Sequence, residues 1–170
     1  MMPLPKSFDQ NEWYLIIALF ITLLIVSILP RRFPLSITIL LFLFAATIAR
    51  LSDHIFAGLY LDLYDVMDTN KFELFDLLSY FLYMPFAYFF VYFYDKWKIR
   101  GIYILLYIVA SSLGGVLIEW ISHYFHVFDY KWWKIQYSLP IYLIVQPFTL
   151  IFFEFIYKAY KSRISEESPL

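Results

Sequence analysis

The sequence predicts an all-α integral membrane protein, a helical bundle with about five transmembrane helices. Of its 170 residues, 62% are hydrophobic, whereas Asp, Glu, Lys and Arg together make up only 16%, against roughly 25% in soluble domains. The apolar residues gather in five runs. Four of these are long and apolar enough to cross a hydrocarbon core of about 30 Å as helices, and the fifth is when its Tyr residues are counted.

The runs define a single membrane domain, 1–170, with predicted spans over residues 13–29, 35–49, 77–94, 102–120 and 140–157, followed by a short cytoplasmic tail over 158–170. The first span follows acidic residues and precedes Arg31 and Arg32. A cleavable signal carries its positive charge before the apolar run, so this span is predicted to remain as an anchor.

The second connection, 51–76, is too polar to span a membrane. Its apolar residues nevertheless recur at helical spacing, namely Ile55, Phe56, Leu59, Tyr60, Leu63 and Tyr64. An amphipathic helix lying in the outer interface is the simplest interpretation, and a re-entrant segment is the alternative. The fourth connection, 121–139, is rich in Tyr and Trp, which favour the membrane interface, so we expect it to rest in the headgroup layer.

Basic residues predict the orientation of the chain. Short loops rich in Lys and Arg face the cytoplasm in multi-pass proteins. If all five spans cross, eight basic residues share one side: Arg31, Arg32, Lys96, Lys98, Arg100, Lys158, Lys161 and Arg163. The opposite side carries fewer basic residues, in longer segments. We therefore expect the N-terminus outside and the C-terminus in the cytoplasm.

A polar stripe on the fourth span is the main candidate for a functional site. Its members follow one another at helical spacing, which places them on one face of an α-helix: Ser112, Gly115, Glu119, His123 and His126. Ionisable residues inside a membrane usually pair with one another or face water. Arg50 lies at a depth similar to Glu119, so we expect an ion pair between them. Asp53, His54 and Gln146 lie near the same level, and one outward-facing cluster could hold all these groups.

Three interpretations of the cluster stay open. It could be a hydrogen-bonded network that fixes helix packing, a binding site or pathway for a ligand, ion or proton, or a metal site. Glu119, His123 and His126 are ligand types that suit zinc, although no HExxH or other specific spacing accompanies them.

The leading functional hypothesis is a non-enzymatic membrane protein that binds a partner or a small ligand through this cluster. A small transporter or ion-conducting subunit is the alternative, although no internal repeat supports it. An intramembrane metal-dependent enzyme is the second alternative.

Composition excludes several other classes. The net charge of −1 argues against a nucleic-acid partner, which would select a basic face. The chain has no cysteine, so disulfides and thiolate chemistry are excluded. The expected partners are the lipid bilayer and either another membrane protein or a second copy of the chain.

One pattern carries a resemblance. Glu119-Trp120 is followed by Tyr130, Trp133, Ser138 and Tyr142, giving E-W-x9-Y-x2-W-x4-S-x3-Y. Together with the short N-terminal anchor and the Pro-Arg-Arg that follows it, the pattern resembles a group of small multi-pass membrane proteins of spore-forming Gram-positive bacteria. That group has no established activity, so the resemblance implies a bacterial plasma membrane and assigns no catalytic or binding residue.

Overall fold

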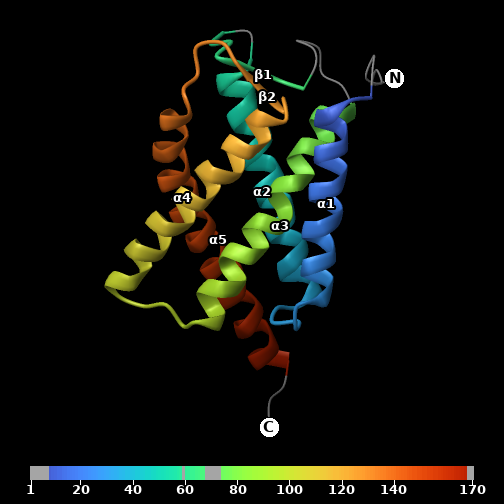
Figure 1. Cartoon of the computed structure of the whole chain (residues 1–170). Helices are drawn as coiled ribbons and strands as arrows, with labels where there is room; N and C mark the ends of the chain where they lie inside the picture. Colours follow the sequence, from blue (N-terminus) through green and yellow to red (C-terminus); the bar gives the residue numbers. More distant parts are fainter. Residues whose placement is uncertain (1–7, 59, 68–73, 168–170) are drawn as a thin grey trace.

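The computed structural model describes residues 8–58, 60–67 and 74–167 and confirms the helical bundle. Within that part, five helices are long and apolar enough to cross a membrane: α1 (Gln10–Ile28), α2 (Leu35–Phe56), α3 (Leu74–Lys96), α4 (Ile102–Tyr124) and α5 (Ser138–Glu167). Two short strands, β1 (Tyr64–Val66) and β2 (Phe128–Tyr130), and a 3-10 helix, η1 (Ile135–Tyr137), lie in the connections. α1 begins at the end of the bundle that carries the strands, and α5 ends at the opposite end (Figure 1).

The helices continue beyond the predicted spans. Hydropathy places the end of the second span at Ala49, whereas α2 continues to Phe56. Arg50, Asp53 and His54 therefore lie in the last two turns of a helix. The buried residues of α2 recur at every fourth position and end in a carboxylate: Ile37, Leu41, Ala45, Ala49 and Asp53. This stripe turns Asp53 toward the interior of the bundle.

The prediction of an amphipathic helix in the second connection is wrong for the residues that the structure describes, and Leu59 lies outside them. A Cβ atom at Gly58 would overlap the carbonyl oxygen of His54, so the turn after α2 requires glycine. The chain then passes through Asp62, which has a φ of +43°, and enters β1. Strand alternation, rather than helical spacing, buries Tyr64 and Val66.

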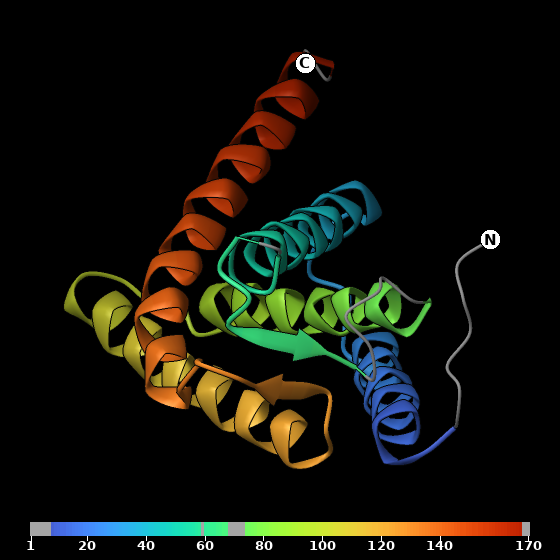
Figure 2. The same cartoon turned by 90° about the horizontal axis from the view of Figure 1, so that it is seen from above.

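An antiparallel sheet joins the second and fourth connections. Tyr64 is the register partner of Tyr130, and Val66 that of Phe128. Figure 2 shows the two strands side by side across one end of the bundle. The pairing satisfies backbone N–H and C=O groups that would otherwise lack partners at a membrane interface.

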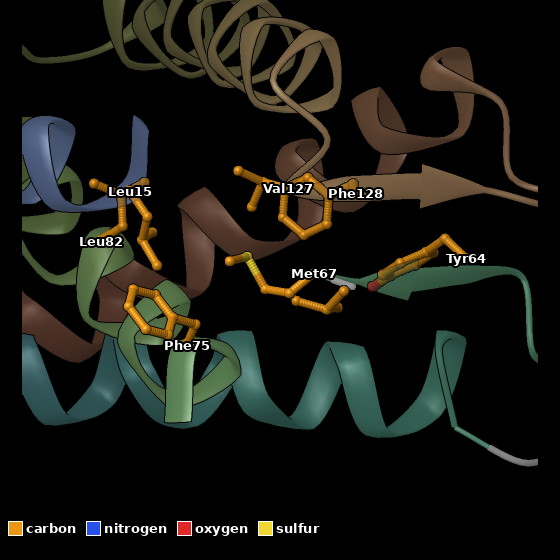
Figure 3. Close-up of a cluster of buried hydrophobic side chains, with 8 residues drawn as sticks. Leu15, Tyr64, Met67, Phe75, Leu82, Val127 and Phe128 are labelled. Atoms are coloured by element: carbon orange, nitrogen blue, oxygen red, sulfur yellow. The ribbon is translucent and has the colours of Figure 1, made fainter. Parts of the chain in front are cut away.

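Two clusters of buried side chains hold the bundle together at its two ends. The first lies under the sheet and joins α1 and α3 to both connections (Figure 3); it consists of Leu15, Tyr64, Val66, Met67, Phe75, Leu82, Val127 and Phe128. The second, at the opposite end, consists of Phe33, Ile37, Leu41, Tyr88, Val91, Tyr92, Phe153 and Ile156. Neither cluster contains a residue of α4, and space remains between α4 and the other helices.

Candidate functional site

A cavity of about 430 Å³ lies between α2, α3, α4 and α5. Small-molecule sites in proteins have volumes of roughly 300–1,000 Å³. The lining residues of α3 run from Tyr83 to Phe93, and those of α4 from Tyr107 to Glu119. At 1.5 Å per residue these stretches are roughly 15–18 Å long. The cavity is therefore elongated along the helices.

The sheet and the segment after it cover one end of the cavity, which we call the polar end. Tyr64, Phe128, Tyr130 and Trp133 all line it. The Trp133 ring lies 5.2 Å from the ring of Phe56 and 5.6 Å from that of Tyr64. Aromatic residues far apart in sequence thus pack together and cover this end of the cavity.

Glu119 accepts hydrogen bonds from three hydroxyl groups at this polar end. Tyr130 and Ser138 donate to its Oε1 atom at 2.7 and 2.5 Å, and Tyr142 donates to its Oε2 atom at 3.0 Å. The indole Nε1–H of Trp133 donates in turn to the Ser138 oxygen at 3.0 Å. The carboxylate therefore joins α4 to β2 and to α5, which is the role expected of a network that fixes packing.

Asp53 has a separate set of partners. The Tyr64 hydroxyl donates to its Oδ1 atom at 2.6 Å, and the Tyr80 side chain is a second hydrogen-bonding neighbour. Arg50 donates to the Tyr80 hydroxyl at 3.4 Å and lies over the Tyr80 ring at 5.7 Å. Arg50 thus lies beside Asp53, about one helical turn away on α2, and the opposite charges of the two side chains attract each other.

The expected ion pair between Arg50 and Glu119 is wrong. Among the residues that the structure describes, no Arg50–Glu119 contact lies within ion-pair distance, and the hydrogen bonds of Glu119 all come from hydroxyl groups. A similar position along two neighbouring helices does not fix which face each side chain occupies.

The two carboxylates nevertheless belong to one site. Tyr64 and Tyr130, which donate to Asp53 and Glu119 respectively, are cross-strand partners, so their side chains leave the sheet on the same face. Asp53 and Glu119 interact electrostatically, and Tyr83 lies within electrostatic range of both. Burial raises the pKa of both Tyr64 and Tyr130 far above the ordinary value, and the adjacent carboxylates raise it further. Both strand tyrosines therefore keep their protons and act as donors at physiological pH.

The opposite end of the cavity is aromatic. Phe90 and Tyr107 stack with their ring centres 5.1 Å apart, and the Tyr107 hydroxyl donates to the Phe90 carbonyl oxygen at 2.6 Å. Trp97 packs against Phe93 beside them. These aromatic rings line this end of the cavity, and its described lining residues there include no charged side chain.

Two neighbouring glycines of α4 have different surroundings. A Cβ atom at Gly115 would meet the ring of Tyr142 at 3.2–3.3 Å, whereas one at Gly114 would meet nothing within 4 Å. Gly115 thus allows α4 and α5 to approach closely enough for Tyr142 to reach Glu119. Gly114 faces the open space of the cavity.

Of the residues predicted from sequence, Asp53, Glu119 and Gln146 line the cavity. The side-chain oxygen of Gln146 is buried without a hydrogen-bond partner in the described part of the chain. Arg50 lies next to Asp53 but outside the lining. Ser112 is fully buried without lining the cavity.

The predicted histidines lie elsewhere. His54 is exposed on the face of α2 away from Asp53. The Nδ1 atom of His123 lies 2.6 Å from the Phe128 carbonyl oxygen, and its ring stacks on Tyr130 at 4.1 Å. His126 lies beyond the end of α4, has a φ of +58° and contacts Asp129. The predicted stripe is broken because the helix ends at Tyr124.

The zinc site considered from Glu119, His123 and His126 does not form. No group of three or more His, Asp or Glu residues within the described ranges is placed to hold a metal ion. His123 turns toward a backbone carbonyl, and His126 has left the helix, so the three side chains do not converge.

Sequence reasoning assigned no site role to Tyr64, Tyr83, Tyr130, Ser138 or Tyr142. Three of these, Tyr130, Ser138 and Tyr142, belong to the pattern that begins at Glu119, and all three donate to that carboxylate. The pattern was therefore a usable signal. Comparison with protein families, curated proteins and solved structures finds no match for the chain.

Proposed function

We propose that this protein is a non-enzymatic membrane protein that holds one amphiphilic small molecule in the cavity between α2, α3, α4 and α5. The observation that carries the proposal is the difference between the two ends of the cavity. Asp53, Glu119 and Gln146 offer polar atoms at or near one end, whereas Phe90, Trp97 and Tyr107 surround the other. A molecule with a polar head and an apolar chain matches both ends. Water alone would leave the aromatic end poorly solvated.

We further propose that the polar end lies in the outer half of a bacterial plasma membrane. The loops that contain Arg31, Arg32, Lys96, Lys98 and Arg100 lie at the end of the bundle opposite the sheet (Figure 1). The positive-inside rule assigns that end to the cytoplasm. The N-terminus is then outside and the C-terminus inside, in agreement with the sequence expectation.

The proposal is tested by filling the cavity. Gly114→Phe places a ring in open space, while Leu117→Phe adds a ring to a lipid-facing position of the same helix that is 56% exposed. The protein is reconstituted in nanodiscs, and binding of three radiolabelled probes with the same twelve-carbon chain is measured: dodecyltrimethylammonium, dodecanoate and monolaurin.

We expect at least one probe to bind the unmodified protein saturably at one molecule per chain. Gly114→Phe should abolish this binding, and Leu117→Phe should leave it unchanged. If no probe binds above its partition into the lipid, or if Gly114→Phe binds normally, the proposed function is wrong.

A further inference from the structure

The charges that line the cavity have one sign. Among the residues that the structure describes, Asp53 and Glu119 are the charged side chains of its lining, and no Lys, Arg or His belongs to it. Arg50 lies beside Asp53 and donates to the Tyr80 hydroxyl, but it does not line the cavity. With both carboxylates ionised, the polar end therefore carries net negative charge even when Arg50 is counted.

The hydrogen-bonding groups at this end also favour a donor, because several acceptors there still have capacity. Four hydroxyl donors beside the carboxylates are already engaged: Tyr64 donates to Asp53, while Tyr130, Ser138 and Tyr142 donate to Glu119. A carboxylate offers about four lone-pair sites, so each still has capacity to accept. The side-chain oxygen of Gln146 is a further acceptor, buried without a partner in the described residues.

We infer that the bound amphiphile carries a cationic head, an amine or a quaternary ammonium group, at the polar end. This inference rests on the proposed function and names the class of ligand. A positive head offsets the charge of Asp53 and Glu119 in a medium where unpaired charges are costly. An amine also supplies the N–H donors that the remaining acceptors require. Aromatic residues also line the cavity beside the carboxylates, including Tyr83 and Trp133, and aromatic rings attract cations.

The same features disfavour anionic amphiphiles. A carboxylate or phosphate head would bring a third negative charge beside Asp53 and Glu119, and no basic side chain in the described part of the lining could receive it. Like charges brought together in a low-dielectric site repel strongly. A neutral hydroxylated head is tolerated, because it can donate to the free acceptors, but it gains no charge pairing.

The three probes with one chain length and different heads separate these possibilities. In nanodiscs of zwitterionic lipid, we expect dodecyltrimethylammonium to bind at least tenfold more tightly than dodecanoate, with neutral monolaurin between them; tenfold corresponds to about 1.4 kcal/mol. Asp53→Asn keeps an oxygen acceptor for Tyr64 and removes the charge. It should weaken binding of the cation by about tenfold and leave monolaurin within a factor of two.

Asp95→Asn is the matched control, because it makes the same chemical change at an acid paired with Arg32 outside the cavity. Its binding of all three probes should equal that of the unmodified protein. Glu119→Gln is a second cavity variant, in case Asp53→Asn fails to fold.

Equal affinity for the three heads, or undiminished cation binding by both cavity variants, would overturn the cationic assignment while leaving the amphiphile site intact. Binding of none of the probes would instead remove the proposed function itself.

Discussion

The two ends of the cavity differ in how their polar side chains are hydrogen-bonded. At the polar end, Glu119 is surrounded by hydroxyl groups from Tyr130 of β2 and from Ser138 and Tyr142 of α5. At the aromatic end, Phe90 and Tyr107 stack, and the Tyr107 hydroxyl donates to a backbone carbonyl of the neighbouring helix. The first arrangement leaves acceptor capacity within the cavity, whereas the second leaves almost none.

This comparison shows how a small helical bundle can form a cavity that is polar at one end and aromatic at the other. Most lining residues of the helices are aromatic or aliphatic, but α2 and α4 each contribute one carboxylate, Asp53 and Glu119. The connections fold back as a sheet and place Tyr64 and Tyr130 beside these carboxylates as hydrogen-bond donors. The helices therefore supply the charges of the site, and the connections supply part of its hydrogen-bonding network.

The largest expected effect comes from removing the centre of the hydroxyl network. Glu119→Ala leaves three hydroxyl donors without their acceptor. Hydrogen bonds to charged groups contribute about 1.5–3 kcal/mol each in soluble proteins but average about 0.6 kcal/mol between membrane helices. We expect the free energy of unfolding, measured by denaturant titration in mixed micelles, to fall by about 2–4 kcal/mol.

Glu119→Gln is the control for that variant, because it keeps an oxygen that can accept from Tyr130 and Ser138. Its loss of stability should be less than half that of Glu119→Ala. A Glu119→Ala variant as stable as the unmodified protein would show that the network does not hold the polar end together.

The two neighbouring glycines of α4 give a matched steric test. Gly115→Val and Gly114→Val change helix propensity equally, but only the first meets the Tyr142 ring. We expect Gly115→Val to be less stable than Gly114→Val by about 1–3 kcal/mol, the usual cost of overpacking. The same unfolding titration measures the difference. Equal stabilities would mean that Tyr142 moves aside freely and is not positioned by close packing against α4.

A double-mutant cycle separates the two carboxylate sets. Arg50 lies beside Asp53 rather than Glu119, so the effects of Arg50→Gln and Glu119→Gln should add within about 0.5 kcal/mol. Arg50→Gln and Asp53→Asn should instead show a coupling of about 0.5–2 kcal/mol. Coupling in the first cycle and additivity in the second would restore the ion pair expected from the sequence.

The smallest effect is expected far from the cavity. Arg32 and Asp95 form an ion pair between the α1–α2 connection and the end of α3, with the Arg32 Nε–H donating to Asp95 at 2.8 Å. Both side chains are about one-third exposed. Asp95→Ala should therefore lower the unfolding free energy by no more than about 1 kcal/mol, and added salt should reduce the difference. A larger, salt-independent loss would show that this end is as tightly specified as the polar end.

Much of the fold could be predicted from sequence, because lipid forces apolar residues into long runs. The same reasoning pointed to Asp53, Glu119 and Gln146, because polar side chains are rare within and next to long apolar runs. The strands could not be predicted in this way. β1 and β2 are three residues long and distant in sequence, and the apolar residues near β1 also fit helical spacing.

The histidines and the tyrosines show two further limits. Spacing placed His126 on the face of Glu119, but the helix ends at Tyr124, and sequence periodicity does not report where a helix stops. Tyr64 and Tyr83 are two of 16 tyrosines in the chain, most of which interface anchoring explains equally well. Only the three-dimensional arrangement separates tyrosines that face a carboxylate from those that anchor the bundle.

Photoaffinity labelling of the unmodified protein tests the central claim most directly. A probe with an amphiphile's head and a diazirine at the end of its chain is bound in nanodiscs and irradiated, and the labelled residues are identified by mass spectrometry. The account predicts labelling at the aromatic end, at Phe90, Trp97 or Tyr107, and loss of that labelling with excess unlabelled amphiphile. Labelling confined to lipid-facing residues such as Leu113 and Leu117, and insensitive to competitor, would contradict it.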